Sequence, residues 1–155
     1  MSISKMVEQV TEFHKAFGLP IADKPHTCVD LNLSSLRHSL ILEEVNELYV
    51  AQVEKDLSSI ADGICDCIYV LMGTAITYGL GSRLEEIFDE VHRSNMSKLV
   101  PDGSVLRRED GKVLKGPLFT PPDLKKILGK KYPNVQKCKD VSACQQFGCT
   151  GDCND

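Results

Sequence analysis

An apolar segment that carries two acids constrains the fold of this chain most. Residues 60–76 read IADGICDCIYVLMGTAI, with apolar residues on every side of a helix. A helix that is apolar all round packs inside a bundle rather than on its surface. Its charged residues are Asp62 and Asp66, one turn apart. Burying an ionised carboxylate costs on the order of several kcal/mol unless a cation or strong donors compensate, so these acids need a partner.

A second pair of acids lies on an apolar stripe just upstream, within LILEEVNELYVA at residues 40–51. Leu36, Leu40, Glu44, Glu47 and Ala51 are spaced by four, four, three and four residues, which is one face of an α-helix. The stripe therefore predicts two inward acids on this helix as well. No equally clear inward bases accompany the four acids. Mg²⁺ or Mn²⁺ explains them best, because hard divalent ions prefer carboxylate oxygen.

The remaining patterns predict an all-α fold with one short hairpin or ordered loop. Two Asp/Gly turn signals in PDGSVLRREDGKVLKGP, residues 101–117, predict that loop. Caps and apolar periodicity predict five helices. The first spans residues 3–17, the second runs from a cap at Ser34 or Ser35 to about Glu54, and the third runs from a cap at Asp56 to near Gly79. The fourth begins at a capping box formed by Ser82 and Glu85, and a short fifth helix spans residues 121–128.

Composition and charge narrow the class of protein. A chain of 155 residues is one domain long, and its net charge of −4 argues against a nucleic-acid backbone as the main partner. The amphipathic N-terminus does not look like a signal peptide. The longest uncharged run, residues 67–82, is broken by glycines and is short for a bilayer. We expect a soluble, cytoplasmic protein without a membrane partner.

The cysteines separate a body from a tail. Four of the seven fall within the last 18 residues, which predicts a domain at residues 1–133 and a cysteine-rich tail at 134–155. The gaps in the tail lack the paired CxxC spacing of common zinc modules. A zinc site, two disulfides and free thiols all stay open for its cysteines, which are Cys138, Cys144, Cys149 and Cys153.

The acid-bearing segments resemble a known superfamily. EEVNE (43–47) followed by ADGICDCIYVLMGTA (61–75) resembles the all-α nucleoside triphosphate pyrophosphohydrolases, which include MazG, dimeric dUTPases and phosphoribosyl-ATP pyrophosphohydrolase and share the pattern EExxE, a gap, then ExxD. EFHKAFGLPI, LRHSLILEE and VHRSNMSKLVPDG look like the MazG-like branch of phages and bacteria. The resemblance implies a four-helix-bundle MazG-like fold that a second chain completes, as a homodimer or homotetramer.

The resemblance also implies a reaction and the residues for it. These enzymes cleave a nucleoside triphosphate between the α- and β-phosphates and release pyrophosphate. Glu44, Glu47 and Asp62, with Asp66 assisting, would hold Mg²⁺ or Mn²⁺, and Glu43 would orient or deprotonate the attacking water. The alternatives are a solvated position for Glu43 and a hydrogen bond between helices for Asp66.

Cationic and amide side chains are the candidate substrate contacts. Asn95 and Lys98 resemble the nucleotide or phosphate contacts of the family. Further phosphate contacts are expected from Arg37, Arg107, Lys112 and Lys115. The alternatives are an ordinary acid partner for Arg37, a position at a helix C-terminus for Asn95, and plain surface charge for the others.

One departure from the family pattern motivates an alternative function. Aligning Asp62 with the acid of ExxD places Ser59 where the family has a glutamate. Weaker or relocated metal binding would make the chain a non-catalytic nucleotide sensor or interaction module. A ferritin-type redox site is disfavoured because it needs Glu-x-x-His, and no histidine stands three residues after Glu44, Glu47 or Asp62.

Overall fold

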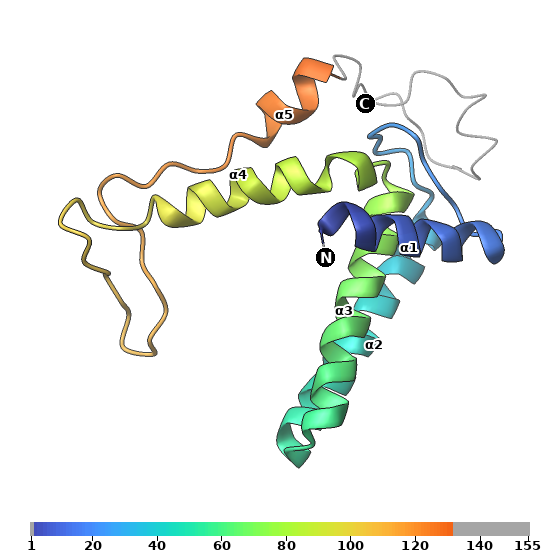
Figure 1. The fold of residues 1–155 in the computed structure, drawn as a ribbon, viewed down its shortest axis with the longest axis horizontal. Coiled ribbons are helices and arrows are strands. Elements are labelled where there is room, and N and C mark those ends of the chain that lie inside the picture. Colours follow the sequence, from blue (N-terminus) through green and yellow to red (C-terminus); the bar gives the residue numbers. More distant parts are fainter. Residues whose placement is uncertain (1, 132–155) are drawn as a thin grey trace. The chain divides into compact units, whose positions relative to one another are not determined.

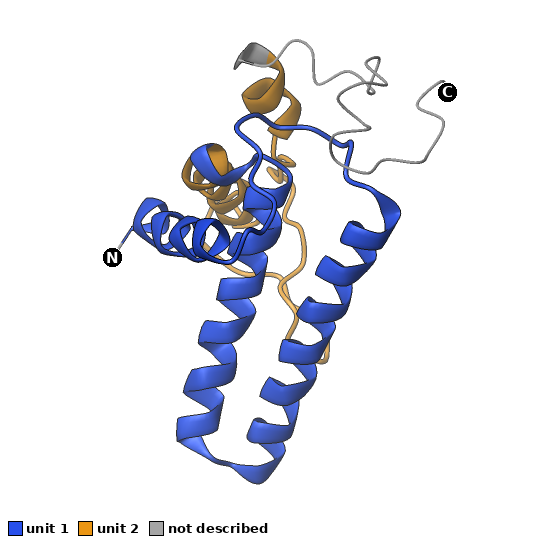
Figure 2. Cartoon of the chain, turned by 90° about the vertical axis from the view of Figure 1, so that its right-hand side faces the viewer, with its two compact units in different colours: residues 1–82, 134–155 blue, residues 83–133 orange. Residues whose placement is uncertain are grey.

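The computed structural model describes residues 2–131, and the regular structure in this range is helical apart from one isolated bridge (Figure 1). The all-α prediction is therefore confirmed. The described chain forms two compact units, one running to Ser82 and one beginning at Arg83 (Figure 2). The helices are α1 (Ile3–Ala16), α2 (Leu31–Glu54), α3 (Leu57–Thr77), α4 (Leu84–Met96) and α5 (Leu124–Lys131), with a 3₁₀ turn at Gly81–Arg83.

In the first unit, α1 packs against α3. Ser2 caps α1 by accepting a hydrogen bond from the Lys5 N–H, and Gly18 follows the helix with a φ of 65°. The buried side chains of α1 are Val10 and His14. These two residues lie one turn apart, so a single stripe of α1 faces the core.

The helices α2 and α3 form an antiparallel pair (Figure 2). Lys55 adopts the left-handed conformation at the turn, and Asp56 caps α3 as predicted, accepting from the Ser58 N–H. The prediction that Ser34 or Ser35 caps α2 is wrong. Asp30 does so, because its carboxylate accepts from the Leu33 N–H and the helix begins one turn earlier than expected.

The apolar helix α3 is buried only in part within one chain. Its buried residues are Gly63 and, near its end, Gly73, Ala75, Ile76 and Thr77. The expectation of burial all along the helix therefore fails for the single chain, because α2 and α1 cover only part of its circumference. By length and composition α3 is also able to span a membrane, a criterion that core helices of soluble proteins meet too.

The second unit holds α4, the loop after it and α5. The predicted capping box is wrong, since α4 begins at Leu84 with Arg83 at the N-cap and no side-chain cap bond. The predicted hairpin has one antiparallel bridge, between Arg107 and Val113. The last helix begins three residues later than predicted, because Asp123 accepts from the Lys126 N–H after the two prolines.

Candidate functional site

Two contacts fix how α2 lies against α3. Arg37 Nε donates to Thr74 Oγ1 over 3.2 Å. Further along, α2 meets α3 at Gly63, where an added Cβ would lie 3.1 Å from Leu48 Cα. Arg37 and Leu48 are eleven residues apart, as are Thr74 and Gly63, so both contacts belong to one antiparallel register. The glycine permits this close approach because it has no side chain.

This register brings the acids of α2 level with those of α3. The pKa of Glu44 is raised above its ordinary value, first by burial and then by the negative charges of Asp66, Glu47, Glu43 and Asp62. Among these charges Asp66 has the largest effect. The five acids that the sequence singles out therefore share one electrostatic neighbourhood, which we call the acid cluster.

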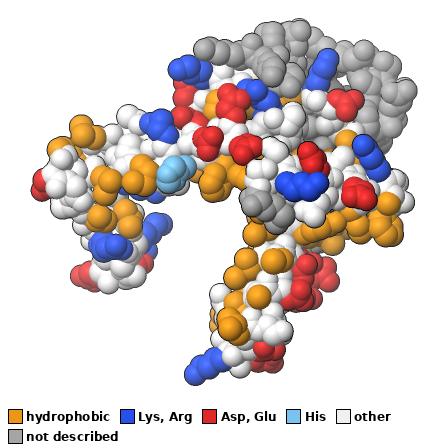
Figure 3. All heavy atoms as spheres, in the orientation of Figure 1, with side chains coloured by type: hydrophobic (Ala, Val, Ile, Leu, Met, Phe, Trp, Pro, Cys, Tyr) orange, Lys and Arg blue, Asp and Glu red, His pale blue; other side chains and the backbone are white. Residues whose placement is uncertain are grey.

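The acid cluster is more exposed than the sequence predicts. Glu44 and Asp66 are half-buried, whereas Glu43, Glu47 and Asp62 are exposed. The reason is that, within the described part of the first unit, the arm that carries the cluster consists of α2 and α3 (Figure 2). In the space-filling view, acidic side chains gather along one edge of this arm and apolar ones along another (Figure 3).

Charge and donor type suit the acid cluster to a hard divalent ion. Within residues 2–131, no lysine, arginine or histidine forms an ion pair with any of the five carboxylates. In the same range, no three histidine, cysteine or acidic side chains are already placed to hold one ion. The oxygen donors and the uncompensated negative charge fit Mg²⁺ or Mn²⁺. Their role as ligands stays a prediction.

Ser59 has a local structural partner. Its hydroxyl donates to the Asp56 carboxylate over 2.7 Å, within the first turn of α3. This bond and that of the Ser58 N–H lower the pKa of Asp56. The residue that stands at the expected glutamate position thus contributes to the helix cap.

Arg37 lies in the interior and links α2 to α3. It is 8% exposed, donates from Nη2 to the Val70 carbonyl over 2.7 Å, and has a pKa lowered by burial. His14 lies close by, since a Cβ added at Gly73 would meet both side chains. The Nδ1–H of His14 donates to the Pro20 carbonyl over 2.8 Å. The contact of Arg37 with a phosphate stays a prediction.

The other candidate substrate contacts lie in the second unit. Lys98 Nζ donates to Asn95 Oδ1 over 2.7 Å, so the two side chains that resemble family contacts are adjacent. Arg107 donates to the Gly111 carbonyl over 3.0 Å, and Lys115 lies 4.5 Å above the centre of the Phe119 ring. Lys112 is exposed. Their binding of substrate stays a prediction.

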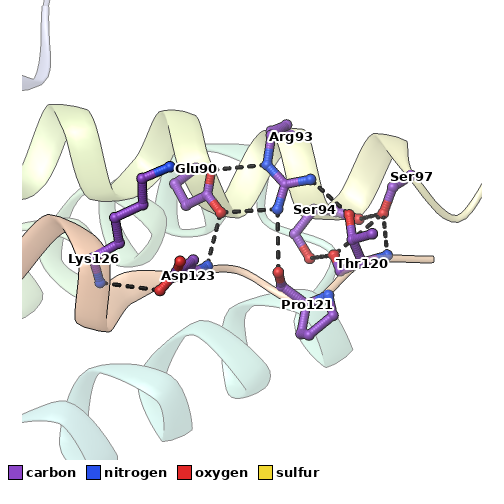
Figure 4. A network of polar contacts seen from close by, with 8 residues as sticks. All are labelled: Glu90, Arg93, Ser94, Ser97, Thr120, Pro121, Asp123 and Lys126. Carbon is purple, nitrogen blue, oxygen red and sulfur yellow. Dashed lines mark hydrogen bonds and ion pairs between the residues drawn. The ribbon is translucent and has the colours of Figure 1, made fainter.

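A polar network that the sequence did not single out joins α4 to the segment before α5 (Figure 4). Arg93 donates to both oxygens of Glu90 at 2.8 Å, and the Asp123 N–H donates to Glu90 at 2.7 Å. The Arg93 bonds are the first cause and the Asp123 bond the second for a Glu90 pKa lowered to about 2. The three-residue spacing signals the Glu90–Arg93 pair, but nothing local signals Asp123 or Thr120, which also accepts from Arg93.

The cysteine-rich tail, with Cys138, Cys144, Cys149 and Cys153, lies outside the described residues. The boundary predicted at residue 133 lies outside them too. The division into a body and a tail therefore stays a prediction.

One family profile matches more than half of the chain. The profile of the phosphoribosyl-ATP pyrophosphohydrolase family matches residues 10–95. A mimivirus protein, the uncharacterised L479 of Acanthamoeba polyphaga mimivirus, is 28% identical over 144 residues, or 90% of this chain. The chain spans about half of that relative, at 53% of its length. A solved structure of a proposed NTP pyrophosphohydrolase from Exiguobacterium sp. 255-15 is 25% identical, with a TM-score of 0.42 over 90% of this chain and 99% of that one.

Proposed function

Because the chain belongs to the phosphoribosyl-ATP pyrophosphohydrolase family, we propose that it hydrolyses a nucleoside or deoxynucleoside triphosphate between the α- and β-phosphates. The products are a nucleoside monophosphate and pyrophosphate, and the role is cleaning or remodelling of the nucleotide pool. The observation that carries the proposal is the crowding of four carboxylates around Glu44. Such a cluster suits a reaction whose catalysis consists of positioning and charge neutralisation.

The residues of the acid cluster have two roles in the proposed reaction, metal binding and proton acceptance. Glu44, Glu47, Asp62 and Asp66 hold Mg²⁺ or Mn²⁺, with Asp66 a full member because its charge acts most strongly on Glu44. When bound, the metal neutralises phosphate charge and acidifies the attacking water. Glu43 is exposed beside this set and accepts the proton of that water.

The assembly and location belong to the same proposal. A second copy of the chain covers the apolar side of the α2–α3 arm and completes the bundle, as a homodimer or homotetramer. The protein acts in the cytoplasm, where its triphosphate substrates are found, and binds neither nucleic acid nor a membrane.

Pyrophosphate release tests this function. A panel of ribo- and deoxyribonucleoside triphosphates, incubated with the full chain and Mg²⁺ or Mn²⁺, should yield pyrophosphate and monophosphate, and chelation should stop the reaction. Glu47→Gln should lower kcat by about a hundredfold or more, because it removes an ionic ligand. Glu109→Gln, on the exposed loop, is the matched control. Release of orthophosphate alone would overturn the proposal.

A nucleotide sensor is the second candidate. The bond of Ser59 to Asp56 favours it, because this residue is occupied in a helix cap where the family pattern has an acid. In that case the chain binds nucleotides tightly but releases no pyrophosphate at any metal concentration. Equilibrium binding measured beside the turnover assay separates the two candidates.

A further inference from the structure

A recess lies between α1 and α3, on the first unit. Its volume is about 400 Å³, within the range of small-ligand sites. Val10, Ile68 and Met72 give it an apolar lining, and the exposed side chains of Gln9, Glu12 and Cys65 also line it. The recess therefore combines an apolar interior with a few polar groups.

The ring of Tyr69 bounds this recess. Phe13 packs edge-on against Tyr69, with ring centroids 5.7 Å apart and planes at 85°. Phe13 does not itself line the recess. Tyr69 is 39% exposed and is thus held in place by Phe13 while still open to a ligand.

The recess adjoins the acid cluster along α3. Asp62, Asp66 and Tyr69 are spaced by four and three residues, so they share one face of the helix. Cys65 lies on the same side, three residues after Asp62 and four before Tyr69. Tyr69 lies about 4.5 Å beyond Asp66 along the helix axis. One nucleotide is long enough to place its phosphates at the acids and its base at Tyr69.

We propose that this recess is the nucleobase subsite, with the base stacked against Tyr69 and its edge facing Gln9. This inference rests on the function proposed above for the acid cluster. An aromatic base suits the recess because bases stack on aromatic rings and the glutamine amide offers both a donor and an acceptor to a base edge. A second copy of the chain suits the opposite side of the arm better, where Ile64 and Leu71 are exposed.

Kinetics with and without a base test the subsite. For the triphosphate that the enzyme turns over fastest, Tyr69→Leu should raise KM about tenfold or more, because stacking on the ring is lost. For ribose 5-triphosphate, which has no base, the same variant should leave KM unchanged. Phe88→Leu, which removes an exposed ring from α4, is the matched control. Equal effects of Tyr69→Leu on both substrates would overturn the subsite and leave the hydrolase assignment standing.

Protection of Cys65 gives a test that needs neither turnover nor a variant. Cys65 is an exposed free thiol in the recess, so iodoacetamide should modify it in the full chain. The rate at Cys65, followed by peptide mass spectrometry, should fall at least about threefold with one of the common deoxynucleoside monophosphates at about ten times its Kd. It should not fall with 2-deoxyribose 5-phosphate or pyrophosphate. Equal rates with all of these ligands would overturn the subsite, whereas protection without pyrophosphate release would keep it and overturn the hydrolysis.

Discussion

Glu44 is the residue on which the charges of two helices converge. Its carboxylate is half-buried, and Asp66, Glu47, Glu43 and Asp62 all disfavour its ionised form. Repulsion among these carboxylates destabilises the metal-free fold. A bound divalent cation would replace it with attraction between the carboxylates and the metal. The same carboxylate is thus expected to lower stability in chelator and to raise it with metal.

We therefore expect Glu44→Gln to have opposite effects in the two conditions. In EDTA its Tm should be higher than that of the wild type, because one of five repelling charges is gone. In Mg²⁺ or Mn²⁺ the wild type should gain more Tm than the variant, and kcat of the variant should fall by about a hundredfold or more. Thermal unfolding in EDTA and in metal measures the two changes in Tm, and the pyrophosphate assay measures kcat. Glu109→Gln is the control for all three. A variant that responds to metal as the wild type does would remove Glu44 from the ligand set.

Among the secondary-structure elements, the contact of α2 with α3 depends on a missing side chain. A Cβ at Gly63 would lie 3.1 Å from both Cα and Cβ of Leu48, so the two helices would have to separate by a few tenths of an ångström. Backbone is what yields here, not the flexible end of a side chain. The acids of the cluster lie on the same two helices close to this contact, so their positions depend on it.

Gly63→Ala should consequently destabilise the chain although alanine is the better helix former. We expect a loss of about 1–3 kcal/mol in the free energy of unfolding, the usual cost of overpacking. Metal affinity should fall as well. Gly129→Ala, on α5 with open space around the site of the added Cβ, is the control and should be neutral or stabilising. Denaturant unfolding and Mn²⁺ titration are the measurements.

The stability of the contact between α4 and the segment before α5 should depend on pH through Glu90. The Arg93 and Asp123 bonds lower its pKa to about 2, so the stabilisation is present above the ordinary range of a glutamate and is lost as the pH falls toward 2. Glu90→Gln should speed hydrogen exchange at residues 120–128 near neutral pH and flatten its dependence on acid. Asp89→Asn, one residue earlier, should change neither. Exchange that is the same in wild type and Glu90→Gln would contradict the role of this bond.

At the scale of the whole molecule, one apolar stripe on α2 and one on α3 are exposed in the single chain. On α2, Val45 and Tyr49 are 47% and 65% exposed, and on α3, Ile64 and Leu71 are 46% and 52% exposed. Side chains this apolar, repeated at helical spacing, are typical of an interface between subunits. Closed symmetric pairing would bury both stripes at once.

We expect size-exclusion chromatography with light scattering to give a dimer or tetramer. The double variant Ile64→Lys, Leu71→Lys should shift it to the monomer, since two desolvated charges would lie in the interface. Leu31→Lys, at the exposed first turn of α2, should leave the assembly intact. A wild-type monomer at micromolar concentration would rule out this interface.

Local patterns predicted the elements and the acids, and long-range packing decided what they missed. The Asp56 cap and the two acid pairs are visible in a single helical turn of sequence. The cap at Asp30 was missed because Asp30, Ser34 and Ser35 are all good N-cap residues within a few positions of one another. The local sequence does not show which of them begins the helix. The Tyr69 recess was not predictable from the sequence, because it depends on α1 packing across more than fifty residues of chain.

The shared register of α2 and α3 has a consequence for which length changes this chain tolerates. Arg37 meets Thr74 at one end of the arm and Leu48 meets Gly63 nearer its tip. One residue inserted between these two points on either helix would turn everything beyond it by about 100° and aim its carboxylates elsewhere. The loop at residues 101–117 pairs mainly with itself, for example from the Leu114 N–H to the Leu106 carbonyl, so insertions at its turns should spare the helices of its unit. Natural variants of this chain should thus differ in length at the loop and keep the arm at one length.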